Sequence, residues 1–202
     1  MNENKIDITF SPIKEFLDAV DTVLNSNTFL VQFDATSDNI IEDLKTFLHS
    51  EAFINQIAVQ DKTREWYNLH NFDHNTQDYV IKSGNILNDT FELKINEILN
   101  QKMEYLTAML TADSSKGRFR SFYDTQISNE KAKLIVNNFT SSLSTKNDRK
   151  LYFIAPNFLK ETNKKYSKNE NLRYFQGING NDTATVILTN NTGFLLLTNG
   201  SD

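Results

Sequence analysis

The chain contains no cysteine, so disulfide bonds, thiolate nucleophiles and cysteine-ligated metal centres are excluded. It has only six glycines and two prolines, and no glycine-rich loop of the kind that cradles phosphates is present. Of its three histidines, His70 and His74 have the spacing of two zinc ligands on one helix. The Asn and Asp residues between them disfavour a helix there, so the sequence does not favour zinc.

Long apolar runs are also missing, because no stretch approaches the length needed to span a bilayer. The first residues lack the positively charged segment followed by an apolar run that marks a secretory signal. The sequence therefore predicts a cytoplasmic protein with no membrane partner. A length of 202 residues with 39% hydrophobic residues suits one domain over residues 1–202.

Charge is unevenly distributed along this chain. Residues 1–112 hold 18 acidic and 8 basic side chains, whereas residues 113–202 hold 8 acidic and 13 basic ones. An acidic half followed by a basic half is typical of some nucleic-acid enzymes, and equally of a protein with two solvated faces. The overall pI near 5.3 argues against strong non-specific DNA binding, so any nucleic-acid surface has to be local.

Most candidate elements follow from hydrophobic periodicity and turn residues. The sequence predicts amphipathic helices that begin near Pro12, Ser37 and Ala132. It also predicts strands at residues 28–33, 55–60 and 151–154, a polar connection at residues 61–77, and a hairpin of residues 183–188 and 194–197.

One further hairpin, over residues 78–95, brings chemistry-bearing side chains together. Residues 79–81 are β-prone, residues 83–85 are a turn signal, and the apolar residues of 91–95 alternate with polar ones. Because a strand has period two, Glu92 and Lys94 share one face. If Asp78 pairs with Glu92 or with Lys94, the turn centres on residue 85 or 86, where the turn signal lies. Facing Cβ atoms lie about 4.5–5.5 Å apart, which is close enough for Asp78 and Glu92 to ligate one ion.

An Asp on one strand followed by acid-x-Lys on the next resembles the motif of the PD-(D/E)xK nuclease superfamily, which has the restriction-endonuclease-like fold. The resemblance covers residues 77–112, with weaker support to about residue 155, and departs from the motif where Gln77 replaces proline. It implies an α/β or α+β fold in which helices flank a mixed central sheet. It also implies that Asp78 and Glu92 hold Mg²⁺ or Mn²⁺, while Lys94 orients the attacking water. The expected activity is cleavage of nucleic acid phosphodiester bonds.

A second interpretation of the same residues removes that site. The sequence from Asp89 to Glu92 fits a capping box at a helix start, and apolar residues continue from Ile95 to Leu110 with helical spacing. A helix that begins at Asp89 would separate Glu92 from Lys94 around its axis. The sequence leaves both interpretations open.

Residues 116–123 interleave cations with aromatic side chains around a glycine. Lys116, Arg118 and Arg120 have the charge to contact phosphates, and Tyr123 has a ring that can stack on an unpaired base. The alternative is that the aromatic residues dock this loop on the core while the cations stay in water.

A non-catalytic function is the rival of the nuclease. In that hypothesis the chain is an acidic immunity or inhibitor protein, or a phage accessory factor, whose acidic amino-terminal half binds a basic protein partner.

Overall fold

The structure is a computed structural model that describes residues 6–82, 86–98, 102–113, 119–121, 123–144, 149–160, 174–175 and 181–200. Its helices are α1 (Ser11–Leu24), α2 (Ile40–Leu48), α3 (Glu51–Thr63), α4 (Lys102–Thr111), α5 (Asn129–Leu143) and the short 3₁₀ helix η1 (Pro156–Phe158). Its strands are β1 (Phe29–Asp34), β2 (His70–Asp73), β3 (Asp78–Ile81), β4 (Ile95–Glu97), β5 (Lys150–Ile154), β6 (Thr183–Thr189) and β7 (Thr192–Thr198).

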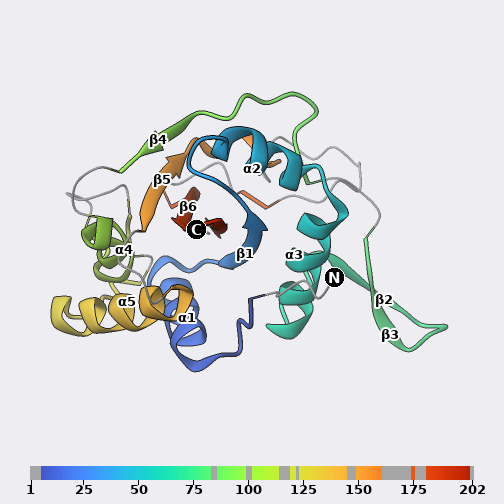
Figure 1. Cartoon of the computed structure of the whole chain (residues 1–202). Coiled ribbons are helices and arrows are strands. Elements are labelled where there is room, and N and C mark those ends of the chain that lie inside the picture. Colours follow the sequence, from blue (N-terminus) through green and yellow to red (C-terminus); the bar gives the residue numbers. More distant parts are fainter. Residues whose placement is uncertain are drawn as a thin grey trace.

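A five-stranded sheet lies at the centre of the fold, with strand order β1-β7-β6-β5-β4. All four of its strand pairs are antiparallel. Helices α1, α4 and α5 lie on one side of the sheet and α2 and α3 on the other (Figure 1). The remaining two strands, β2 and β3, form a separate hairpin that projects from the α3 side.

The sheet is apolar on both faces because side chains alternate along each strand. In β7, Phe194 and Leu196 join the cluster beneath α1, α4 and α5, while Leu195 and Leu197 join the cluster beneath α2 and α3. Helices α1 and α5 meet through Phe16 and Phe139, whose rings stack with centroids 4.0 Å apart. The central strands are therefore buried on both faces.

Helix α3 closes the open edge of β1 with two polar side chains spaced four residues apart. Gln60 bonds both backbone groups of Leu30, with Nε2 to oxygen at 2.6 Å and Oε1 to nitrogen at 3.1 Å. Gln56 does the same to Gln32 at 2.8 and 2.9 Å. The spacings match, because four helical residues rise about 6.0 Å and two strand residues about 6.6 Å. A free edge that would invite another strand is thus occupied by side chains.

Replacement of Gln60 by leucine tests this edge seal. The variant leaves a buried N–H and a buried C=O of β1 without partners, so we expect the free energy of unfolding to fall by about 2 kcal/mol. Urea denaturation measures the loss. The control is Asn55→Leu, an exposed position of the same helix where the change should cost less than about 0.5 kcal/mol. Equal effects at the two positions would show that the seal contributes nothing.

The mixed α and β character predicted from the sequence is confirmed, and so are the helices at 12–24 and 132–143 and the strands at 28–33 and 151–154. The carboxy-terminal hairpin is confirmed as β6 and β7. The strand predicted at 55–60 is wrong, because these residues lie inside α3. A mixed sheet is also wrong, since the central sheet is antiparallel throughout the described strands.

In the described residues, no helix is both long and apolar enough to cross a membrane.

Candidate functional site

The hairpin predicted over residues 78–95 is wrong. Strand β3 pairs with β2, so that Asp78 faces Asp73. Strand β4, which follows Glu92 and Lys94, pairs instead with β5 in the central sheet. Residues 70–73 pair with β3 in place of residues 91–95. Their polar side chains resembled a connection, but they form a strand in register immediately before a four-residue turn. Asp78 therefore lies in the β2 and β3 hairpin, whereas Glu92 and Lys94 lie outside the described strands, immediately before β4.

The carboxylate of Asp78 is engaged by the end of α3. Lys62 donates from Nζ to its two oxygens at 2.9 and 3.2 Å, and this contact holds the pKa of Asp78 below its usual value. Among the described residues, no three His, Asp or Glu side chains lie close enough to share a metal ion. The arrangement does not fit the ion site implied by the resemblance, and binding of Mg²⁺ or Mn²⁺ stays a prediction.

The helix predicted to start at Asp89 is wrong as well. Residues 91–94 are neither helix nor strand, and α4 begins only at Lys102. Phe91 lies against His49, with ring centroids 5.6 Å apart, and packs on the α2 and α3 side of the core. Apolar docking of this segment overrides its capping signal, because local propensity is a weak prior against tertiary packing.

The basic and aromatic loop is only partly covered by the structure, since Lys116 and Arg118 lie outside the described residues. The backbone of Arg120 is clasped by the Asn181 side chain, which accepts from its N–H and donates to its C=O, each at 2.8 Å. Phe119 is buried and Tyr123 is exposed. Phe119 thus docks on the core, as the alternative interpretation of this loop expects. Nucleic-acid contact by Arg120 and Tyr123 stays a prediction.

The most distinctive surface is the projecting hairpin of residues 70–81, called the arm from here on (Figure 1). Three of its apolar side chains are unusually exposed: Phe72 by 41%, Val80 by 43% and Ile81 by 46%. Large apolar groups gathered on one element mark interaction sites more often than scattered ones do.

Aromatic rings line one face of the arm from its base to its tip. Tyr67 stacks on Tyr79 at 3.8 Å, Phe72 meets the edge of Tyr79 at 5.2 Å, and His74 meets Phe72 at 5.1 Å. We call Tyr67, Phe72, His74 and Tyr79 the aromatic row. Because cross-strand neighbours Phe72 and Tyr79 share a face, the row is continuous across both strands.

The base of the arm is fixed by Asp61, which is fully buried near the end of α3. Its carboxylate accepts the backbone N–H of Asn68 at 3.0 Å and that of Leu69 at 2.8 Å, and contacts His70 Nδ1 at 3.0 Å. Its own carbonyl accepts from Trp66 at 3.0 Å. One residue therefore holds the whole turn that carries the chain from α3 into β2.

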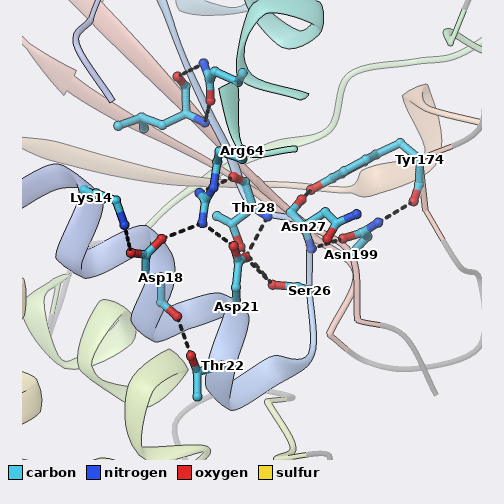
Figure 2. Close-up of polar contacts among 12 residues, drawn as sticks. Lys14, Asp18, Asp21, Thr22, Ser26, Asn27, Thr28, Arg64, Tyr174 and Asn199 are labelled. Atoms are coloured by element: carbon cyan, nitrogen blue, oxygen red, sulfur yellow. Dashed lines mark hydrogen bonds and ion pairs between the residues drawn. The ribbon is translucent and has the colours of Figure 1, made fainter. Parts of the chain in front are cut away.

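Arg64 ties the same end of α3 to the body (Figure 2). Its guanidinium bonds Asp18 at 2.9 Å and also Asp21, both on α1, and donates to the carbonyl of Thr28 at 3.2 Å. It lies over the Trp66 ring, 4.4 Å from the centroid. The arm thus starts from a clamped point rather than from a free loop.

We call Arg64 and its partners Asp18, Asp21 and Thr28 the clamp. Asp21 is its buried centre. It accepts from Thr28 N at 2.8 Å and from Ser26 Oγ at 3.1 Å in addition to Arg64 (Figure 2). Burial raises its pKa to about 6, against the lowering effects of Arg64 and of these hydrogen bonds. The cavity beside the clamp is lined by Lys14, Asp18 and Arg64, whose charges are already paired with one another or with Asp21, so we assign this cluster a structural role.

The backbone of the arm also adopts conformations that side chains disfavour. Glu65 and Tyr67 before the arm and Gln77 in its turn have φ values of 58°, 54° and 55°. Left-handed non-glycine residues are uncommon and cluster at functional sites, where the surrounding structure imposes them.

Sequence reasoning missed the arm because residues 61–77 are rich in Asn, Asp and His. The available signal was the alternation of Phe72 with polar neighbours, followed by a second β-prone run from Tyr79 to Ile81.

Comparison with known proteins does not indicate the role of the arm, since no protein family, characterised protein or solved structure matches this chain.

Proposed function

We propose that this chain is a non-catalytic interaction protein that docks the aromatic row of its arm on a protein partner. The observation that carries the proposal is a projecting hairpin with exposed apolar side chains on a base held by Asp61 and Arg64. Nothing in the described arrangement assembles the alternative nuclease site.

The composition of the arm suits binding. Aromatic side chains dominate binding energy at protein interfaces, because each buries a large area while few torsions become fixed. Tyr79 already contacts both Tyr67 and Phe72, so the rotamers of these rings are restricted before a partner arrives. Preorganisation of this kind lowers the entropic cost of association.

The charge around the arm favours a basic partner. Residues 29–82 carry nine acidic and four basic side chains. At the tip of the arm, Asp73 directly faces Asp78, and like charges on opposed strand positions repel. Lys62 already offsets part of this repulsion at Asp78, and the acidic surface would speed the encounter with a basic partner.

A capture experiment with two matched double variants tests the proposal. The arm variant is Phe72→Ser with Ile81→Ser, and the control is Ile41→Ser with Val59→Ser, which removes exposed apolar groups from α2 and α3. We expect the immobilised wild type and control to retain the same basic protein from an extract of the source cells. The arm variant should retain about a hundredfold less, because each interfacial anchor is worth about 1–2 kcal/mol.

A nuclease assay on the same preparation tests the alternative, catalytic function. The chain is incubated with single- and double-stranded DNA and RNA, with and without Mg²⁺ or Mn²⁺, beside Glu92→Gln and Lys94→Ala. Metal-dependent cleavage that both substitutions abolish would contradict the non-catalytic proposal. Retention that is equal for the arm and control variants would contradict the assignment to the arm.

A further inference from the structure

Within the described part of the chain, the outer edge of β3 pairs with no other strand, and its Tyr79 N–H donates to Oδ1 of the neighbouring Asp78 at 2.7 Å. Lys82 N donates to Leu69 O at 2.8 Å, which makes residues 69 and 82 a hydrogen-bonded pair of the β2 and β3 ladder. Because such pairs alternate, Val80 also directs its backbone groups toward β2, whereas Tyr79 and Ile81 direct theirs outward. Among the other described strand edges, β1 is sealed by α3, β4 is protected by its length of three residues, and β2 is engaged at its start, where His70 N donates to Tyr67 O at 3.4 Å.

We propose that β3 pairs antiparallel with β3 of a second copy of this chain, with Val80 on the two-fold axis. This inference goes beyond the docking of a partner on the aromatic row and does not depend on it. A two-fold axis requires that the same residues contact each other in both directions, so the sequence of β3 has to be complementary to its own reverse.

Backbone geometry and charge select the same register. The outward residues of the two strands have to face each other, which permits Tyr79 opposite Tyr79, Tyr79 opposite Ile81, or Ile81 opposite Ile81. When Tyr79 faces Ile81 of the partner, Val80 faces Val80 and Asp78 faces Lys82. In the other two registers Val80 faces Asp78 or Lys82. Only one register therefore pairs an acid with a base at both ends.

The side chains concerned are accessible in the single copy. Asp78 is paired with Lys62, but that ion pair is exposed, with 59% and 46% of the two side chains in solvent. Lys82 donates to the Asn68 carbonyl at 3.0 Å in an exposed contact. Exposed contacts of this kind contribute little, so Lys82 can turn to the partner Asp78 at small cost. When Asp78 turns to the partner's Lys82, it also releases the Tyr79 N–H, with which it makes an exposed contact, for pairing across the interface.

Pairing in this register joins the two arms into one four-stranded sheet. The aromatic rows of both copies then lie on the same face, with each Tyr79 beside the Ile81 of the other copy. The contact is short, and interfaces below about 1,200 Å² are typical of transient complexes, so we expect a dissociation constant on the order of 0.1 mM.

A disulfide crosslink reports the register directly, because the chain has no cysteine of its own. In the proposed dimer, Val80 and its symmetry mate are a non-hydrogen-bonded pair with Cα atoms about 4.5 Å apart, within the range that a disulfide spans. We expect Val80→Cys to form covalent dimer at least about tenfold faster than Val59→Cys, the exposed control on α3, under the same oxidant. Equal rates at the two positions would overturn the inference.

Charge reversal provides a second test that needs no crosslink. Asp78→Lys alone and Lys82→Glu alone each place like charges opposite each other, so we expect each to weaken self-association by about tenfold in sedimentation equilibrium. A mixture of the two variants restores both opposite-charge pairs and should dimerise as wild type does. A mixture no stronger than either variant alone would exclude this register, whatever happens to the binding of other proteins.

Discussion

Arg64→Ala should lower the free energy of unfolding by about 3–5 kcal/mol, the range for removal of one partner from a buried ion pair. Only 13% of the Arg64 side chain is exposed, and it joins Asp18, Asp21 and the carbonyl of Thr28. Its loss leaves the buried Asp21 carboxylate without a cation. Thermal or urea unfolding at pH 8 measures the effect.

The pH dependence of this loss identifies its cause. Without Arg64 the pKa of Asp21 rises further above the wild-type value of about 6, so the variant protonates Asp21 near neutral pH. An acid with a raised pKa destabilises the fold as pH rises from its unfolded-state pKa through its folded-state pKa. The deficit of Arg64→Ala should therefore be smaller at pH 5 than at pH 8. A deficit independent of pH would mean that lost packing, not charge, explains the variant.

A substitution at Lys14 distinguishes the contribution of the buried clamp from that of the exposed Lys14–Asp18 ion pair. Lys14 bonds only Asp18 within the clamp and is 60% exposed. Lys14→Ala should cost less than about 0.5 kcal/mol, as exposed pairs on one helix generally do. A loss as large as that of Arg64→Ala would contradict the view that burial makes the clamp important.

Asp61→Ala should cost about 2–4 kcal/mol and release the arm from the body. The substitution removes the acceptor of two backbone N–H groups, those of Asn68 and Leu69, and of the His70 ring. Each buried donor left without a partner costs about 1–3 kcal/mol, moderated here by local opening to water.

Hydrogen exchange locates that loss. We expect the described amides of residues 67–82 to exchange at least about tenfold faster in Asp61→Ala, while those of β6 keep their order of protection. The control is Asp73→Ala, since the contact that the described residues give Asp73 is an exposed one, from Asn75 N in the turn. An arm that keeps its protection in Asp61→Ala would show that other contacts hold it in place.

The sequence predicts those elements that have a clear apolar period. Helix α1 and the pair β6 and β7 follow from it, because their burial is decided by local side-chain pattern. The strand predicted at residues 55–60 fails for the opposite reason. Gln56 and Gln60 break the apolar pattern of α3, and their purpose appears only when β1 lies alongside.

The candidate site was harder to predict than the fold. Asp78 was correctly placed on a strand, but its partner strand could not be identified, since β2 consists largely of residues typical of turns. What makes β2 a strand is the buried Asp61 nine residues before His70, a tertiary contact with no local signature. Pairing choice is set by such contacts, so Asp78 pairs within the β2 and β3 hairpin while Glu92 lies outside the described strands, before β4.

The most direct test of the central claim is site-specific photo-crosslinking from the arm. A photoreactive residue replaces Phe72 in one protein and Val59, the exposed control on α3, in another, and each is irradiated in an extract of the source cells. If the aromatic row is the docking surface, position 72 yields one discrete crosslinked protein and position 59 does not, and Tyr79→Ala reduces that product by about tenfold or more. The same crosslinked products from both positions, or none from position 72, would contradict docking through the arm.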